Sequence, residues 1–169
     1  MGISMEDLIS SAKPPMRSAT ICMDQSLQAE HDELTEELDH VRRSNPTKMG
    51  DTAEGHELAE RIGQLEDAMQ EHLQTFRFKG LSKNALNVLY KRFPPREKGN
   101  LWDPESGGFA LVAAAAVDPA MTEDQAKRLF DAISDGQSDL LIGAAWLASK
   151  GSHSIPLSAS ASELRRGNG

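Results

Sequence analysis

The histidines are the first residues of this 169-residue chain that could do chemistry. His56 and Glu57 begin the run His-Glu-Leu-Ala-Glu, in which Glu60 stands where a zinc-binding His-Glu-x-x-His helix needs its second histidine. One histidine cannot hold zinc from one helical face, so the near-match fails and a solvated helix face is the better interpretation. His31 and His72 lie on helical seams, where a polar residue usually sets register. We assign no metal ligand.

Residues for nucleophilic, acid–base or phosphate chemistry are equally sparse. Cys22 has no neighbouring cation that would activate its thiol, and we expect a small core residue. Glu36 and Glu37 belong to a long charged stripe, which indicates solvation rather than general acid–base work. Gly107 and Gly108 alone do not make a phosphate-binding loop. The sequence therefore assigns no catalytic, cofactor-binding or metal site and indicates a binding protein, with its partner-binding residues unassigned.

One short segment could bind nucleic acid. Phe76 and Phe78 alternate with Arg77 and Lys79, and strand aromatics beside basic residues can stack on bases. The alternative is a half-buried strand with its aromatics inward and its charges in water, which the period-2 alternation favours.

Charge is placed unevenly along the chain. Residues 24–72 carry 14 acidic and 4 basic side chains, whereas the remainder carries 12 acidic and 14 basic. An acidic arm repels phosphates, so we expect no nucleic-acid and no membrane partner, and a basic protein partner remains compatible. Neither a membrane-length apolar run nor a signal-peptide pattern stands out, which predicts a cytoplasmic protein.

Two stretches carry heptad spacing. The expected helices run from Asp24 to about Arg43 and from about Thr52 to His72, with a turn over Ser44–Asp51. Their seam positions are Leu27, His31, Leu34, Leu38 and Val41 in the first, and Leu58, Ile62, Leu65, Met69 and His72 in the second. Residues 24–72 are therefore predicted to form an antiparallel coiled-coil hairpin.

Strands are predicted on both sides of this hairpin. Residues 1–23 contain a short helix that Ser4 caps, a stop at Pro14 and Pro15, and a strand over 17–23. A second strand covers 73–79, and the returning hairpin would pair the two strands at its base. A two-stranded ribbon is marginal alone, so the C-terminal half must pack on it.

Residues 73–151 are predicted to form the second strand and a helical domain. The expected helices cover 83–91, 109–117, 122–133 and 134–150, with a polar loop over 96–108, and residues 152–169 form a flexible Ser-rich tail. We expect Phe76, Phe78, Trp102 and Trp146 in the core, and Leu140 and Leu147 facing inward. The predicted fold class is α+β, mostly α: a helical cluster with a two-stranded antiparallel ribbon and a protruding antiparallel coiled-coil hairpin.

The order of these features resembles one family. The matching segments are Asp-Leu-Ile-Ser-Ser-Ala-Lys-Pro (7–14), Thr-Ile-Cys (20–22), the acidic heptad region, Thr-Phe-Arg-Phe-Lys-Gly-Leu (75–81), Phe-Pro-Pro-Arg (93–96), Asp-Pro-Ala-Met-Thr-Glu-Asp-Gln-Ala (118–126), Asp-Gly-Gln-Ser-Asp-Leu-Leu (135–141) and Ser-Ile-Pro-Leu-Ser-Ala-Ser-Ala-Ser (154–162). In this order the chain resembles the tail assembly chaperones encoded upstream of the tape measure gene in long-tailed phages of actinobacteria.

The resemblance implies a function by binding, without catalysis or cofactors. Such chaperones hold the phage tape measure protein in solution, recruit the major tail protein and promote tail tube polymerisation. It also implies action in the bacterial host cytoplasm during infection and absence from the mature virion. A frameshifted longer form, or self-association, is a further implied partner. Two alternatives stay open: a structural virion protein of the tail or connector, and a coiled-coil regulator of nucleic acid.

Overall fold

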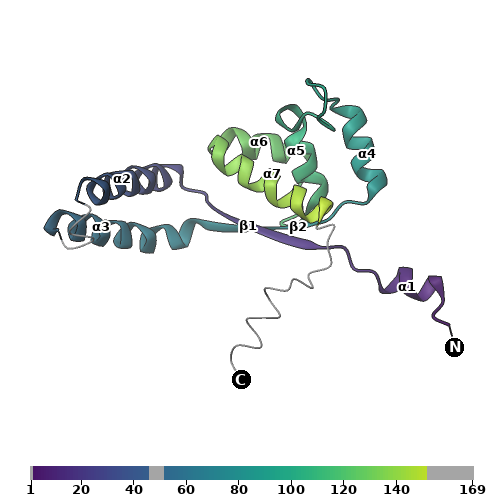
Figure 1. The fold of residues 1–169 in the computed structure, drawn as a ribbon, viewed down its shortest axis with the longest axis horizontal. Coiled ribbons are helices and arrows are strands. Elements are labelled where there is room, and N and C mark those ends of the chain that lie inside the picture. Colours follow the sequence, from purple (N-terminus) through teal and green to yellow (C-terminus); the bar gives the residue numbers. More distant parts are fainter. Residues whose placement is uncertain (1, 46–51, 152–169) are drawn as a thin grey trace.

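The structure is a computed structural model that describes residues 2–45 and 52–151. Over these residues it is a mostly helical α+β fold with seven α-helices and one three-stranded antiparallel sheet (Figure 1). The elements in chain order are α1 (Met5–Ser11), β1 (Met16–Cys22), α2 (Gln25–Ser44), α3 (Ala53–Met69), a 3₁₀ turn η1 (Gln70–His72), β2 (Leu73–Lys79), α4 (Lys83–Arg92), α5 (Pro104–Ala115), β3 (Ala116–Asp118), α6 (Glu123–Ala132) and α7 (Asp135–Lys150). The predicted α+β class is confirmed.

The sheet has the order β1-β2-β3, so the predicted two-stranded ribbon is corrected to three strands. Ala19 pairs with Phe76 across β1 and β2, and Ala116 pairs with Phe78 across β2 and β3. Phe76 and Phe78 are buried while Arg77 and Lys79 are exposed, as the alternation predicts. Strand β3 was missed because it continues the same apolar run as the preceding helix.

The main core lies between the sheet and the helices α5 and α7. The prediction of a helix over 109–117 is corrected at both ends. Asp103 caps α5 and Pro104 occupies its first turn, so the helix begins five residues earlier. At the other end, pairing of Ala116 with Phe78 turns the last residues into a strand. The residues of α5 and α7 that are completely shielded from solvent are Leu111, Val112, Ala115, Leu141, Ala145 and Ala148.

Helix α7 buries one stripe rather than every apolar side chain. Leu141, Ala145 and Ala148 face the core, whereas Leu140 is 51% exposed and Leu147 is 56% exposed. Successive helical residues are rotated by about 100°, so one flat contact cannot cover neighbours on opposite sides of the stripe. The prediction that Leu140 and Leu147 face inward is therefore wrong.

Helices α2 and α3 lie side by side, run in opposite directions and project away from the other helices (Figure 1). Seam residues form a second, smaller core that also includes Cys22; its buried members are Cys22, Leu34, Val41, Leu58, Leu65 and Met69. The last predicted seam residue, His72, is exposed in η1, because α3 ends at Met69. The predicted turn lies mostly within 46–51, outside the described residues.

A hydrogen-bonded junction joins this helix pair to the sheet and the helices α4–α7, which together we call the body of the molecule. The side-chain amide of Gln25 donates to the carbonyl of Cys22 at 2.8 Å and to the side-chain oxygen of Gln137 at 2.7 Å. Gln137 donates in turn to the Cys22 carbonyl at 3.2 Å, and the Ser134 N–H donates to Gln25 at 3.0 Å. These bonds fix the first turn of α2 against the first turn of α7.

Helix α1 lies at the opposite end of the molecule from the helix pair and buries none of its residues (Figure 1). Ser4 caps it as predicted, and its side chain accepts a hydrogen bond from the Glu6 N–H. The predicted tail over 152–169 lies outside the described residues.

Candidate binding surface

The histidines singled out in the sequence lie apart from one another. Nε2 of His31 is 3.0 Å from Oε1 of Glu66 on the facing helix, so this seam histidine bridges α2 and α3. His56 lies in the first turn of α3, and His72 is exposed in η1. Among the described residues, no group of three or more His, Cys, Asp or Glu side chains comes together in a way that could hold a metal ion.

Cys22 and the pair Gly107 and Gly108 contribute to packing in the structure. Cys22 is buried, and its thiol donates to the Asp24 carbonyl at 3.4 Å. Gly107 and Gly108 lie inside α5, where an added Cβ would collide with the ring of Phe93 and with the Ile142 side chain respectively. The two glycines therefore allow α5 to pack closely against its neighbours, and they do not form a loop.

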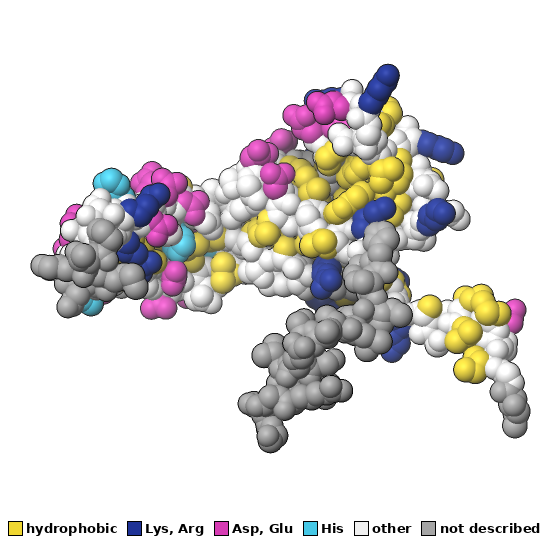
Figure 2. Space-filling view, viewed as in Figure 1, with side chains coloured by type: hydrophobic (Ala, Val, Ile, Leu, Met, Phe, Trp, Pro, Cys, Tyr) yellow, Lys and Arg dark blue, Asp and Glu magenta, His cyan; other side chains and the backbone are white. Residues whose placement is uncertain are grey.

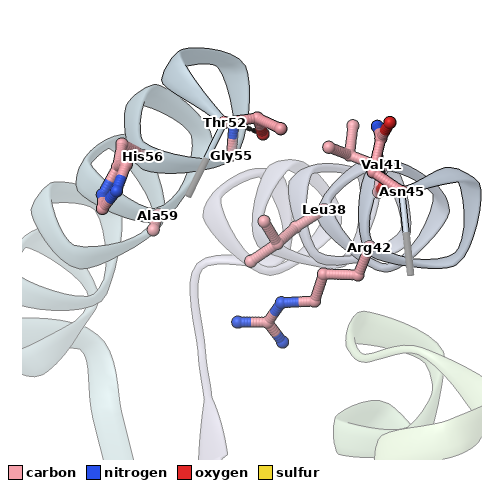
Figure 3. A pocket seen from close by; sticks show the side chains of 8 residues that line it. All are labelled: Leu38, Val41, Arg42, Asn45, Thr52, Gly55, His56 and Ala59. Carbon is pink, nitrogen blue, oxygen red and sulfur yellow. Dashed lines mark hydrogen bonds between the residues drawn. The ribbon is translucent and has the colours of Figure 1, made fainter. Parts of the chain in front are cut away.

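A gap of about 220 Å³ lies where α2 ends and α3 begins (Figure 3). The described residues around it are Leu38, Val41, Arg42, Asn45, Thr52, Gly55, His56 and Ala59. The Thr52 hydroxyl accepts from the Gly55 N–H at 3.1 Å, and the Asn45 amide donates to the Val41 carbonyl at 3.4 Å. Two of its polar side chains thus cap helix ends, and among the described residues the gap lies at the end of the seam.

Three aromatic rings gather on the helical body. Trp102 and Trp146 stack with centroids 5.8 Å apart and an interplanar angle of 19°. Tyr90 packs beside both rings, at 6.3 Å from Trp102 and 6.4 Å from Trp146. Trp102 is buried and Trp146 is partly buried, so Trp102 meets the expectation of a core residue fully and Trp146 only in part.

The two tryptophan rings border a cleft of about 580 Å³, which we call the tryptophan cleft. It lies between α7 and the segment that leads into α5, and its lining is mostly apolar. The lining residues are Gly99, Asn100, Leu101, Trp102, Pro104, Asp139, Ile142, Gly143 and Trp146. Its volume falls within the range of about 300–1,000 Å³ that is typical of clefts that bind apolar ligands.

Partly buried polar contacts hold the wall of the cleft in place. The Asp103 carboxylate accepts from the Ser106 hydroxyl at 2.7 Å and from the Glu105 N–H at 3.1 Å, and Arg96 lies 2.7 Å away. The Ser106 bond and, less strongly, the Arg96 charge lower the pKa of Asp103 below its ordinary value. This cap anchors the adjacent Trp102 at the start of α5.

A second hollow, of about 320 Å³, lies on the other side of Leu101, between α4 and the end of α7. We call it the lysine-rimmed hollow, because Lys83 and Lys150 are the only charged side chains among the described residues that line it. Its full lining is Leu81, Lys83, Leu86, Asn87, Tyr90, Leu101, Ser149 and Lys150. The Tyr90 hydroxyl is buried and finds no hydrogen-bond partner among the described residues, and burial raises the pKa of this phenol.

Exposed apolar side chains surround the two hollows. Leu101, at 58% exposure, projects between them, and Figure 2 shows hydrophobic side chains gathered over α4–α7 with lysines and arginines at the margin. Sequence reasoning placed Leu101 and Trp102 in a polar loop and missed this surface. The available signal was an apolar pair within an otherwise polar segment.

The described residues contain no helix with both the length and the apolar character needed to cross a membrane. The chain matches no family model, no curated protein and no solved structure.

Proposed function

We propose that this chain is a phage tail assembly chaperone that binds the tape measure protein, keeps it soluble and promotes tail tube polymerisation. The observation that carries the proposal is the tryptophan cleft, a mostly apolar and partly open surface of about 580 Å³. A holding protein needs to cover apolar helical segments reversibly, and a cleft with stacked aromatic walls suits apolar anchors of an amphipathic helix.

The resemblance of the feature order to tail assembly chaperones supports the same function. It names the tape measure protein as client and the major tail protein as the subunit to be recruited, in the host cytoplasm and outside the mature virion. No catalysis or cofactor is required, because such a chaperone works by binding.

The acidic helix pair contributes solubility in this proposal. Residues 24–72 carry a net charge of −10 by sequence, and Figure 2 shows acidic side chains around α2 and α3. Net charge of one sign keeps a client-bound complex from associating further. We propose that the pair is a coiled-coil arm, whose seam is mostly buried and whose charged outside stays in water.

Gly143 offers a sharp test of the cleft. It lines the cleft within α7, and an added Cβ there meets open space, so Gly143→Glu puts a charge into the cleft without a steric conflict in the fold. Gly63 in α3 also faces open space, and Gly63→Glu is the matched control. We expect co-expression with the tape measure protein to give a soluble complex for the parent chain and for Gly63→Glu, and an insoluble client for Gly143→Glu.

Two outcomes would count against the proposal. If the parent chain neither captures nor solubilises the tape measure protein, the chaperone function fails. If mass spectrometry finds the chain in stoichiometric amounts in purified particles, the alternative of a structural tail or connector protein takes its place. If Gly143→Glu and Gly63→Glu capture the tape measure protein equally well, the chaperone function remains supported, but the cleft is not its binding site.

A further inference from the structure

The N-terminal helix α1 has an apolar face with no partner in the described chain. Met5, Leu8 and Ile9 lie on one side of the helix and are 63%, 46% and 67% exposed, and Ile3 before it is 75% exposed. A seven-residue helix is too short to be stable in water by itself. This segment therefore needs an apolar surface that the body of its own chain does not supply.

The connection to the body is stiff and points away from it (Figure 1). Ala12 is extended, and Pro14 and Pro15 fix their own backbone angles and favour extended residues before them. The Gly80 N–H donates to the Pro15 carbonyl at 2.9 Å, which ties the base of the arm to the start of α4. Return of α1 to the body of its own chain would require a sharp bend in the four residues between α1 and β1, of which Pro14 and Pro15 have fixed φ angles.

The base of this arm lies beside the lysine-rimmed hollow. Gly80 follows β2 and precedes Leu81, which lines the hollow, and it packs so closely on α7 that an added Cβ would overlap the Ala148 carbonyl. Ser149 and Lys150, the next residues of α7, line the hollow as well. The arm of one copy therefore starts next to a hollow that the arm of a second copy could fill, which allows two copies to exchange arms about a two-fold axis.

The charges of the two surfaces are complementary. Glu6 and Asp7 are the charged residues of α1, whereas the charged side chains of the hollow are Lys83 and Lys150. Figure 2 shows hydrophobic side chains on α1. The C-terminal segment 152–169 is a poorer match, because it contains two arginines and one glutamate. Opposite charges at the rim favour the arm over that segment.

We infer that the N-terminal arm, residues 3–11, docks in the lysine-rimmed hollow of a second copy of this chain. The apolar face of α1 covers Leu101 and the wall formed by Leu86 and Tyr90, and its two acidic residues lie toward the lysines. This self-association needs no client and goes beyond the proposed chaperone function, although the hollow shares Leu101 with the tryptophan cleft.

Analytical ultracentrifugation of the full chain over a series of concentrations tests the inference. The arm variant combines Leu8→Asp with Ile9→Asp, and its control combines Ser10→Asp with Ser11→Asp, which adds the same charge outside the apolar face. Helix α1 buries no residue, so none of these changes disturbs the fold. We expect concentration-dependent dimers for the parent and the control, and a dissociation constant raised about tenfold or more for the arm variant.

A second pair of variants tests the hollow. The hollow variant combines Lys83→Glu with Leu101→Asp, and its control combines Lys91→Glu with Val88→Asp. Leu101 and Val88 are 58% and 59% exposed, and both control residues lie on α4 outside the hollow. We expect the hollow variant to lose self-association and its control to retain it. Mixing the arm variant with the hollow variant should give mixed dimers that are weaker than those of the parent, because the intact arm of one copy and the intact hollow of the other still form one of the two contacts.

Several results would overturn the inference. A parent chain that stays monomeric at every concentration excludes docking between copies. Unchanged dimers in the arm variant would place the interface elsewhere on the molecule. Failure of the two defective variants to associate when mixed would show that arm and hollow do not meet across copies.

Discussion

The helix pair and the helical body bury their apolar residues in different ways. In the pair, α2 and α3 enclose a narrow core of heptad residues, and charged side chains cover the outside. In the body, helices α5 and α7 pack on the sheet through a broader core with Phe78, Leu111 and Leu141 at its centre. The pair buries its apolar side chains along one seam, with a gap of about 220 Å³ where α2 ends and α3 begins. The body instead leaves the tryptophan cleft and the lysine-rimmed hollow open.

This difference has a physical origin. A heptad stripe is narrow and its partner is the same kind of stripe, so two helices satisfy each other. The helices of the body meet a sheet, a long loop and one another at several angles, and such a surface leaves spaces between elements. Regular packing thus gives the pair a solvated exterior, and irregular packing gives the body the surfaces available for binding.

The largest expected effect on stability comes from removing the Phe78 ring at the centre of the body. Phe78 is fully buried between the sheet and the helices, so Phe78→Ala should lower the free energy of unfolding by about 3–5 kcal/mol. Urea denaturation monitored by tryptophan fluorescence measures this. Lys79→Ala, on the exposed side of the same strand, should change it by about 0.5 kcal/mol or less. Equal effects would mean that the sheet is not covered as described.

Truncation of a buried side chain in the helix pair should lower the free energy of unfolding by a smaller amount. Leu58 is buried in the seam, and Leu58→Ala should lower stability by about 2–3 kcal/mol, because α2 and α3 have water on their outer sides and can collapse onto a small cavity. Hydrogen exchange should quicken in α2 and α3 and stay slow in α5 and α7. Exchange that quickens equally in all four helices would show that the pair and the body unfold as one unit.

Two glycines of the body differ in how closely other atoms approach them: Gly80 is tightly packed, and Gly143 faces open space. Gly80→Ala would force a Cβ into the Ala148 carbonyl and should destabilise the protein by about 1–3 kcal/mol. Gly143→Ala meets open space within a helix and should stabilise it by about 0.5–1 kcal/mol. Thermal unfolding of the two variants should therefore shift in opposite directions. A shift of the same sign would contradict the close approach of Gly80 to α7.

The smallest expected effect is on the pH dependence of stability, to which the two aspartate caps contribute. Asp24 begins α2 and Asp103 begins α5, and the hydrogen bonds from Ser26 and Ser106 lower their respective pKa values. A carboxyl with a lowered folded-state pKa stabilises the protein above its ordinary pKa of about 4, and this stability disappears as the pH falls through the folded value.

Asp24→Asn and Asp103→Asn keep a capping side chain without the charge. Each variant should lose less stability than the parent protein between about pH 5 and pH 3, which thermal unfolding at a series of pH values would detect. A parent-like acid dependence in both variants would assign the acid sensitivity to other carboxyls.

Local patterns in the sequence predicted much of this fold. The capping box of Thr122 and Gln125 is present in α6, and the period-2 alternation placed Phe76 and Phe78 inward. The heptads placed Leu34 and Leu65 in one shared core. Each of these features depends on residues close in sequence, so composition and spacing sufficed. No residue of the candidate surface was assigned to binding from sequence, because its walls come from α4, α7 and the segment before α5.

The sequence by itself determined the mostly helical α+β class, the acidic helix pair and the caps of several helices. Only the tertiary structure decided that residues 116–118 leave the helix to pair with β2, that Leu140 and Leu147 face water, and that Leu101 lies between two hollows. The reason is that an apolar run in the sequence indicates how much surface must be buried, but it does not indicate which other element covers that surface. The direction of each side chain depends on neighbours that are distant in sequence, and these arrive only when the sheet and the helices pack together.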